Sequence, residues 1–313
     1  MADATAGQVG ESGLIAAVVA RLGTGPQVLL GPGDDAAVVT VPDGRVVATT
    51  DVLVEGVHFR RDWSSGEDVG RKAAAVNLAD VAAMGGRGTA LLVGLAAPAD
   101  LPVSWAVALA DGLRDEAALV GAVVVGGDTV RGDRVVVSVT ALGDLQGRPP
   151  VTRCGARPGD VVVVAGRLGG SAAGLALLLA GRDGGPLVAA HRRPAPPYDL
   201  GPVLARAGAT AMCDVSDGLV VDLLSLCAAS RVGVRLDVDA LPGAPGAARR
   251  DVLHGGEDHA LLATVPRAAV DALADLGVVA VGRVREGGGV TDLAGTRLTP
   301  QGWEHFARGA QGT

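Results

Sequence analysis

The stretch Leu-Gly-Pro-Gly-Asp-Asp-Ala at residues 30–36 places two adjacent carboxylates beside a Gly/Pro/Gly bend. Adjacent ionised carboxylates repel each other, and a turn built from glycine and proline offers them little cover from other side chains. A fold tolerates this arrangement most easily when a cation compensates the charge. The stretch therefore indicates a chain that is organised around a site for cations.

Acidic residues return in similar settings along the rest of the chain. They stand next to small or turn-forming residues, or on a predicted helix: Asp51 after Ala48-Thr49-Thr50, Asp80, Asp128 after Gly126-Gly127, Asp214 and Asp217 around Val215-Ser216, and Glu257-Asp258 after Gly255-Gly256. We expect the fold to bring these side chains together around metal ions and phosphate.

The composition narrows the class of protein. The 313 residues suffice for two domains, and 49% hydrophobic residues with only 2% aromatics predict a core of Val, Leu and Ala. The net charge of -7 argues against nucleic-acid binding. The sequence shows neither an apolar run of about 20 residues nor a basic and then apolar start. We therefore expect a cytoplasmic protein with no membrane partner.

Lysine occurs once, as Lys72, and arginine supplies the remaining positive side chains. A Walker A loop requires Gly-Lys-Ser/Thr, and a protein kinase requires a strand lysine. The sequence contains neither pattern. Phosphate chemistry in this chain must therefore depend on metal ions, arginine and backbone N–H groups.

Strand and helix signals alternate in both halves of the chain. We expect helices at residues 12–22, with Ser12 as the N-cap, and at 67–84, 104–120 and 218–230. The segment Gln-Gly-Arg-Pro-Pro at 146–150 resembles a linker. The prediction is an N-terminal α/β domain at residues 1–148 and a C-terminal α+β domain at 149–313.

Two turns in this plan suit phosphate. Asp214 and Ser216 are two apart at a strand end, so they point to one side, and the N–H groups at the start of the next helix suit phosphate oxygens. Ser and Asp are also common N-cap residues, so a plain helix cap is the alternative. Residues 126–129, Gly-Gly-Asp-Thr, follow a strand predicted at 122–125, where the glycines would let a ligand approach the backbone. A simple tight turn is the alternative there.

Carboxylates with few His or Cys neighbours favour hard cations, above all Mg²⁺. A Mg²⁺ ion usually shares one or two protein carboxylates with substrate phosphates. The candidate acids are too many for one ion. Several Mg²⁺ ions around a polyphosphate fit the sequence better.

A set of short motifs now becomes recognisable along nearly the whole chain. In order, they are Gly33-Asp34-Asp35-Ala36, Thr49-Thr50-Asp51, Gly56-Val57-His58-Phe59, Ala75-Val76-Asn77-Leu78-Ala79-Asp80, Gly126-Gly127-Asp128-Thr129, Ser216-Asp217-Gly218 and Gly255-Gly256-Glu257-Asp258. In this order the chain resembles the thiamine-monophosphate kinase family, which belongs to the aminoimidazole ribonucleotide synthetase-like superfamily. The resemblance implies a two-domain fold of that type, with a homodimer whose N-terminal domains share a β-barrel-like interface. It also implies transfer of the ATP γ-phosphoryl group to thiamine monophosphate.

The resemblance further implies roles for single residues. The implied Mg²⁺ set is Asp35, Thr49, Thr50, Asp51, Asp80, Asp128, Asp214 and Asp217, of which Asp35, Asp214 and Asp217 would be catalytic. The implied nucleotide contacts are Gly127, Asp128, Arg153 and Ser216, and the implied thiamine-phosphate contacts are His58, Glu257 and Trp303. From the residues alone, structural roles for His58, Arg153 and Trp303 stay open. Some relatives carry an aromatic residue late in the helix before Gly126, where this chain has Ala117-Ala118-Leu119-Val120, so we expect adenine to be held differently.

Two alternatives remain at this stage. The nearest enzyme alternative is an aminoimidazole ribonucleotide synthetase-like, ATP-dependent enzyme. The alternative from another class is a non-catalytic nucleotide- or metal-binding sensor. Release of ADP that depends on thiamine monophosphate separates the kinase from both.

Overall fold

The computed structural model describes residues 4–31 and 37–301. By internal contacts the described residues divide into two compact units, the first with residues up to Val81 and 87–147, the second with 82–86 and 148–301. The two units correspond to the expected α/β and α+β architecture. The boundary between residues 148 and 149 stays a prediction.

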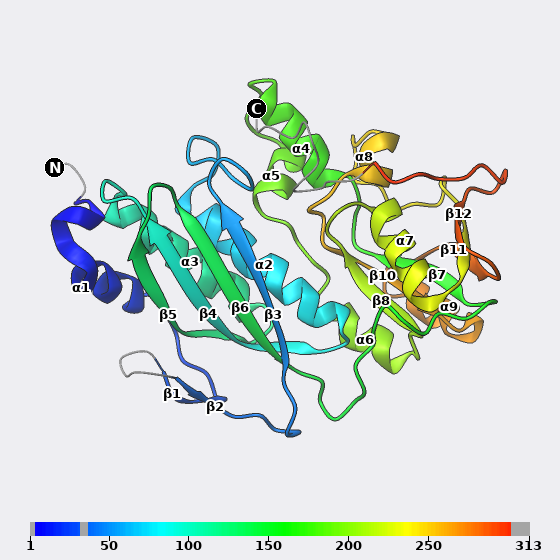
Figure 1. The fold of residues 1–313 in the computed structure, drawn as a ribbon, viewed down its shortest axis with the longest axis horizontal. Coiled ribbons are helices and arrows are strands. Elements are labelled where there is room, and N and C mark those ends of the chain that lie inside the picture. The colour runs from blue at the N-terminus through cyan, green and yellow to red at the C-terminus, as the bar shows by residue number, and fades with distance from the viewer. Residues whose placement is uncertain (1–3, 32–36, 302–313) are drawn as a thin grey trace. The chain divides into compact units, whose positions relative to one another are not determined.

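The first unit is built on a four-stranded sheet in the order β3-β6-β4-β5 (Figure 1). Its elements are α1 (Ala6–Val19), β3 (Val47–Val54), α2 (Gly66–Ala83), β4 (Arg87–Ala97), α3 (Val103–Ala118), β5 (Val123–Arg131) and β6 (Val136–Asp144), and a separate pair is formed by β1 (Val28–Leu30) and β2 (Val38–Val39). The β6 strand is antiparallel to both β3 and β4, whereas β4 and β5 are parallel. Strands β3 and β5 are therefore the two edges of this sheet within the unit.

Helices α2 and α3 lie side by side on one face of this sheet (Figure 1). Alternate β6 residues, Val137, Val139 and Ala141, are buried, as expected for a sheet covered on one face. Glycine lets the two helices approach closely, because a Cβ at Gly70 would stand 2.1 Å from the backbone oxygen of Leu109. A Cβ at Gly112 would stand 2.2 Å from the backbone oxygen of Glu67.

The second unit contains a six-stranded sheet in the order β12-β9-β11-β7-β10-β8. Its elements are β7 (Val161–Ala165), α4 (Gly170–Leu179), α5 (Pro186–Arg192), α6 (Leu200–Arg206), β8 (Ala211–Val215), α7 (Leu219–Ser230), β9 (Gly233–Leu236), α8 (Arg249–His254), β10 (Ala260–Val265), the 3₁₀ turn η1 (Arg267–Ala269), α9 (Val270–Ala274), β11 (Val279–Arg285) and β12 (Gly289–Thr291). Every residue of β7, β8 and β10 is buried. Continuous burial requires cover on both faces, and two hydrophobic clusters supply it, one including α7 and the other α6 and α9.

The predicted helices at 67–84, 104–120 and 218–230 match α2, α3 and α7 to within two residues at each end. The first predicted helix is wrong at its start, because α1 begins at Ala6. Thr5 acts as its N-cap, with the Thr5 N–H donating to Gln8 Oε1 at 2.9 Å. Gly10, at φ 69° and ψ 175°, interrupts α1 two residues before Ser12.

The predicted turn at residues 126–129 is also wrong, because β5 continues through it to Arg131. A register shift between Leu91 and Leu92 lets Gly126 and the residues after it stay paired with β4. No helix among the described residues is both long enough and apolar enough to cross a membrane.

Candidate functional site

Two of the expected site residues, Asp35 and Trp303, lie outside the described residues, as does Asp34 of the acidic pair. The other candidates fall into both units.

Strand β3 and helix α2 bring Thr49, Asp51 and Asp80 to one face of the first sheet. Thr49 Oγ1 donates a hydrogen bond to Asp80 Oδ2 at 2.7 Å. The Asp51 backbone N–H donates to Asn77 Oδ1 at 3.0 Å, and Asn77 Nδ2 donates to the Ala73 carbonyl of its own helix at 2.9 Å. Asn77 and Asp80 are one helical turn apart, so this face carries both carboxylates, Asp51 and Asp80, next to a hydroxyl.

Thr50 lies on the opposite face of the same strand. The side chain is exposed, its hydroxyl donates to the Val139 carbonyl at 2.9 Å, and it accepts from Thr140 Oγ1 at 3.2 Å. Successive strand residues alternate between faces, so the expected pair of threonines is split by the pleat. Only Thr49 has its hydroxyl beside Asp80.

Gly127 and Asp128 lie on β5, at the other edge of the sheet from β3. Three inter-strand spacings separate the two edge strands, which amounts to about 14 Å. Asp128 is exposed, and its Oδ1 accepts the N–H of Thr129 at 2.8 Å. A Cβ at Gly127 would stand 1.9 Å from the Val93 backbone oxygen, so this position requires glycine for strand packing whether or not a ligand binds.

His58 lies in a loop that leaves the end of β3. Its Nδ1 accepts the N–H of Val54 at 3.0 Å, and its backbone oxygen accepts from Lys72 Nζ at 3.0 Å. Phe59 is buried and stacks on Trp105 of α3 with ring centroids 6.4 Å apart. These contacts hold the expected substrate residue in a defined loop.

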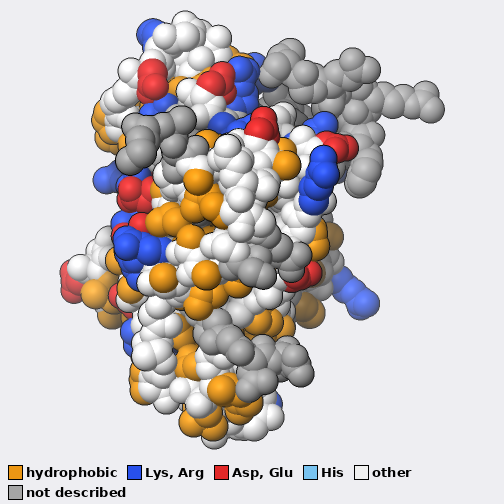
Figure 2. Space-filling view, turned by 90° about the vertical axis from the view of Figure 1, so that its left-hand side faces the viewer, with side chains coloured by type: hydrophobic (Ala, Val, Ile, Leu, Met, Phe, Trp, Pro, Cys, Tyr) orange, Lys and Arg blue, Asp and Glu red, His pale blue; other side chains and the backbone are white. Residues whose placement is uncertain are grey.

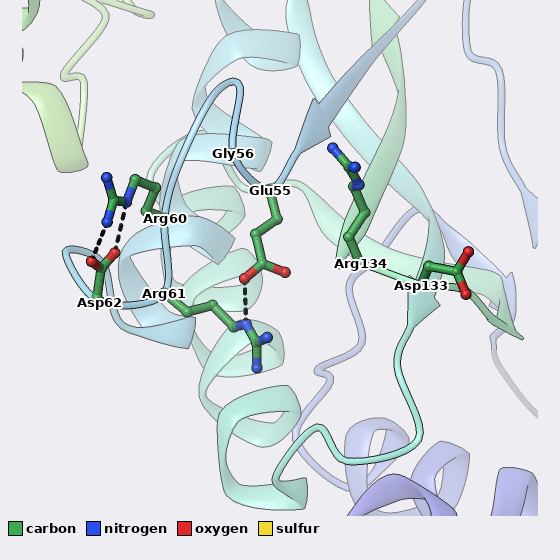
Figure 3. A pocket seen from close by; sticks show the side chains of 7 residues that line it. All are labelled: Glu55, Gly56, Arg60, Arg61, Asp62, Asp133 and Arg134. Atoms are coloured by element: carbon green, nitrogen blue, oxygen red, sulfur yellow. Dashed lines mark hydrogen bonds and ion pairs between the residues drawn. The ribbon is translucent and has the colours of Figure 1, made fainter. Parts of the chain in front are cut away.

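An open hollow of about 640 Å³ borders the same loop (Figure 3). Its lining residues are Glu55, Gly56, Arg60, Arg61, Asp62, Asp133 and Arg134. Glu55 Oε1 accepts from Arg61 Nε at 2.6 Å, while its Oε2 accepts the Val135 N–H at 3.0 Å. Because acids and arginines are equal in number here, the hollow by itself indicates no preference for anions.

In the second unit, Asp214 is the penultimate residue of strand β8 and lies next to a buried histidine. Asp214 Oδ2 lies 3.0 Å from His259 Nδ1, and both residues are buried. The Nδ1 atom donates to the carboxylate, so the other carboxylate oxygen is left for a further ligand. Ser216 and Asp217 follow, partly exposed, before Gly218 and helix α7.

Asp222 organises this turn, although it was absent from the expected site. Its Oδ2 accepts the backbone N–H groups of Asp217 and Gly218, both at 3.1 Å. Burial, with repulsion from Asp214 and Asp217, raises the pKa of Asp222 to about 7. Gly218, at φ 120°, packs so that a Cβ would stand 2.7 Å from the His254 backbone oxygen.

The segment 255–259 carries Glu257 against this turn. The Glu257 N–H donates to the Ser216 carbonyl at 2.7 Å, and the His259 N–H donates to the Val215 carbonyl at 2.9 Å. Glu257 and His259 have positive φ values of 62° and 52°, which are uncommon outside glycine. The segment thus joins Glu257, Ser216 and Asp214 into one connected structure.

Asp258 connects the segment 255–259 to the start of α4 by hydrogen bonds. It accepts the N–H groups of Gly169 at 2.5 Å and Ser171 at 3.0 Å. Burial raises the pKa of Asp258 to about 6 against the lowering effect of these two hydrogen bonds. The Gly169-Gly170-Ser171 segment at the start of α4 therefore binds a carboxylate of the protein itself.

Arg153, an expected nucleotide contact, is exposed, and its backbone oxygen accepts from Ser230 Oγ at 2.9 Å.

Ser171 Oγ lies 3.0 Å from His191 Nδ1, and Glu257 Oε2 lies 3.8 Å from the same nitrogen. A nucleophilic triad would use both ring nitrogens, so this cluster does not form one.

Within the described part of the chain, no three His, Cys, Asp or Glu side chains converge as a metal-binding group. The donor set nevertheless fits Mg²⁺. Thr49, Asp51 and Asp80 offer hard oxygen ligands on one face, and a Mg²⁺ site needs only one or two protein carboxylates when phosphates and waters complete it.

The sequence analysis did not identify Asp222, His259 and Lys72, which contact the candidate site residues in the two units. Asp222 carries a detectable signal, since it stands in the first turn of the helix that follows the Ser-Asp-Gly turn. Lys72 is the single lysine of the chain and lies on a predicted helix. The His259 contact depends on the pairing of β8 with β10, which the local sequence does not reveal.

Two family models match the chain. AIR synthase related protein, N-terminal domain, matches residues 33–145, and AIR synthase related protein, C-terminal domain, matches residues 157–293. Apart from residues 82–86, which belong to the second unit, the two matches fall in the first and the second structural unit, respectively.

Similar proteins cover most of the chain. The thiamine-monophosphate kinase of Mycobacterium tuberculosis (strain ATCC 25618 / H37Rv) is 51% identical over 270 residues, which make up 82% of this chain and 80% of that protein. The crystal structure of thiamine-monophosphate kinase from Stenotrophomonas maltophilia K279a has a TM-score of 0.79 at 34% identity, covering 91% of this chain and 95% of that one. The structure of AaThiL complexed with AMPPCP and TMP also has a TM-score of 0.79, at 36% identity, covering 95% and 97% of the two chains.

Proposed function

The chain belongs to the thiamine-monophosphate kinase family, and on this premise we propose that it transfers the γ-phosphoryl group of ATP to thiamine monophosphate, giving thiamine diphosphate. The observation that carries the proposal is the 51% identity to a thiamine-monophosphate kinase over 270 residues. The AaThiL complex with AMPPCP and TMP supports the same pair of substrates.

The chemistry of the acceptor agrees with the residues present. The second pKa of a phosphate monoester is about 6, so its attacking oxygen is largely ionised at neutral pH and needs little help from a general base. The reaction mainly requires in-line positioning and compensation of the charge on two phosphates that approach each other. We therefore propose direct transfer without a phosphorylated enzyme intermediate.

Several Mg²⁺ ions, when bound, would neutralise phosphate charge in this reaction. The residues proposed to hold them are Asp35, Thr49, Thr50, Asp51, Asp80, Asp128, Asp214 and Asp217. Among these, Thr49, Asp51 and Asp80 are supported by their shared face, and Asp214 by its position next to His259. Thr50 would need its backbone carbonyl, because its hydroxyl is turned to the opposite face.

The remaining roles follow the family assignment. Gly127, Asp128, Arg153 and Ser216 are proposed to contact the nucleotide, while His58, Glu257 and Trp303 are proposed to contact thiamine monophosphate. The bond from the Glu257 N–H to the Ser216 carbonyl supports adjacent nucleotide and substrate contacts within the second unit. We place the reaction in the cytoplasm, where ATP is available and the free thiols of Cys154, Cys213 and Cys227 stay reduced.

We further propose that the active form is a homodimer. The uncovered face of the first sheet exposes Val52, Leu92 and Val130 by 45%, 38% and 53%. The side of the molecule that bears α1 and β5 also shows hydrophobic side chains at its surface (Figure 2). A second copy on the sheet would cover these residues. Light scattering of the purified protein tests this assembly.

The test of the activity is an ATP-consumption assay with Mg²⁺, in the presence and absence of thiamine monophosphate, with thiamine diphosphate read by mass. We expect acceptor-dependent product that is lost in Asp217→Asn. Turnover only with formylglycinamidine ribonucleotide would instead indicate the aminoimidazole ribonucleotide synthetase-like enzyme. Tight nucleotide binding without turnover on either acceptor would indicate a sensor.

A further inference from the structure

Lys72 occupies an unusual place for a charged side chain. It is the only lysine among 313 residues, and its side chain lies inside the first unit, with 2% of the residue exposed. The next residues of α2, Ala73, Ala74 and Ala75, are buried and apolar. Burying an ammonium group costs free energy. A protein that has an apolar side chain of similar volume at such a position is often no less stable. Packing alone therefore does not account for lysine here.

One contact of Lys72 is made with the His58 loop. Lys72 Nζ donates to the backbone oxygen of His58 at 3.0 Å, from the helix beneath the loop. Around this point the loop is closed by further bonds: the Gly56 N–H donates to the Phe59 carbonyl at 2.8 Å, and the His58 N–H donates to the Val54 carbonyl at 3.0 Å. Lys72 thus ties the middle of the loop to α2.

These bonds also determine the state of the imidazole. The backbone N–H of Val54 can only donate, so His58 Nδ1, 3.0 Å away, must accept. In the neutral ring the proton is then on Nε2. The ring therefore has Nε2–H as its donor, and an anionic oxygen is the kind of group that such a donor binds.

We propose that Lys72 is a positioning residue, which fixes the His58 loop so that the imidazole offers Nε2–H as a neutral donor to a phosphate oxygen of the acceptor substrate. The inference rests on the proposed function, since it assigns His58 to the thiamine monophosphate side of the reaction. Lys72 acts through the loop and not by contact with the substrate.

The kinetic test compares Lys72→Met with Lys72→Gln. Methionine has no donor for the His58 carbonyl, whereas the glutamine amide retains one that is one bond shorter. We expect Lys72→Met to raise the KM for thiamine monophosphate about tenfold or more, since small displacements of positioning groups have effects of this size. The Kd for AMPPCP should not change, and Lys72→Gln should lie between Lys72→Met and the unmodified protein. Equal KM values for thiamine monophosphate in all three proteins would overturn the proposal.

A matched pair at His58 tests the donor itself. In His58→Gln the amide nitrogen of the new side chain can replace Nε2, whereas in His58→Asn the shorter side chain can replace only the Nδ1 acceptor. We expect His58→Gln to bind thiamine monophosphate more tightly than His58→Asn. In the His58→Asn background, Lys72→Met should weaken thiamine monophosphate binding no further. Additive losses in the double variant would contradict action through His58.

An NMR measurement separates this inference from the proposed activity. The chain has five histidines, so the ¹⁵N signals of the His58 ring can be assigned by their loss in His58→Gln. We expect the Nε2–H form in the unmodified full-length protein and an altered ring signal in Lys72→Met. If the unmodified protein forms no thiamine diphosphate while the ring signals behave as expected, the proposed function fails and the Lys72–His58 coupling stands. Ring signals identical with and without Lys72, in proteins of equal Tm, would overturn the positioning role.

Discussion

The two units hold their acidic residues in different ways. In the first unit Asp51, Asp80 and Asp128 are at least partly exposed, and neighbouring side chains such as Thr49 and Asn77 arrange their surroundings. In the second unit Asp222 and Asp258 accept pairs of backbone N–H groups, and burial raises the pKa of both. The difference shows that a carboxylate in an acidic motif can serve either a ligand or the backbone that surrounds it.

The largest expected effect concerns the carboxylates that face a ligand. Asp51→Asn and Asp80→Asn should each lower kcat/KM for thiamine monophosphate by about 10³-fold, because a charge that stabilises the transferring phosphoryl group is removed. Steady-state kinetics at saturating Mg²⁺ measures this. Asp275→Asn, at an exposed position after α9, is the control and should stay near the unmodified rate. An Asp51→Asn enzyme with nearly unchanged activity would mean that this acid of the first unit does not serve the ligand.

A smaller effect is expected from the histidine that orients Asp214. His259→Ala removes the donor to Asp214 Oδ2 and should weaken Mg²⁺ binding about 10- to 100-fold, as for other groups that orient metal ligands. Calorimetric titration of Mg²⁺ in the presence of AMPPCP measures this.

The control is His259→Asn, since asparagine tolerates the positive φ of 52° at this position and its amide can reach Asp214. We expect this variant to retain most of the Mg²⁺ affinity. Equal loss in both variants would assign the effect to the backbone and not to the hydrogen bond.

Asp222 should make stability depend on pH. Its pKa is 3.8 in the unfolded chain and about 7 in the folded one, so between these values the native state holds a proton that the unfolded state has lost. Stability therefore falls as the pH rises from about 4 to about 7, by up to about 4 kcal/mol. Asp222→Asn should remove this part of the slope in urea unfolding measured across the range.

The matched variant for this prediction is Asp258→Asn, whose pKa of about 6 confines the effect to a narrower window, from about pH 4 to 6. A slope that Asp222→Asn leaves unchanged would mean that the carboxylate is ionised in the folded protein. It would then belong with the ligand-facing acids of the first unit.

The smallest effect is expected at Thr50, where the pleat turns the hydroxyl away from Asp80. Thr50→Val should change kcat/KM by less than about threefold, whereas Thr49→Val, which loses the 2.7 Å bond to Asp80, should lower it about tenfold. Measuring kcat/KM of the two variants in parallel tests whether the two hydroxyls lie on opposite faces of β3. A larger loss at Thr50 would indicate a ligand on the uncovered face of the sheet.

The sequence predicted several elements and their chemistry well. The sequence placed α2, α3 and α7 to within two residues. The buried residues of α3 and α7 follow the helical period, whereas α2 is buried along most of its length. The prediction failed at residues 126–129, where glycines that usually indicate a turn continue a strand. Pairing with β4 outweighed the local preference of Gly126 and Gly127, and such pairing depends on residues far away in the sequence.

The sequence by itself determined which groups are present: hard oxygen ligands in Gly-flanked motifs, one lysine, and no Walker A loop. These are properties of residue identity and order, and they suffice to indicate the family. Only the tertiary structure decided which groups meet. Strand order separates Asp51 from Asp128 within one chain, and the pleat separates Thr49 from Thr50. Burial of Asp222 and the contacts of Lys72 and His259 arise from packing between segments distant in sequence, which local patterns do not encode.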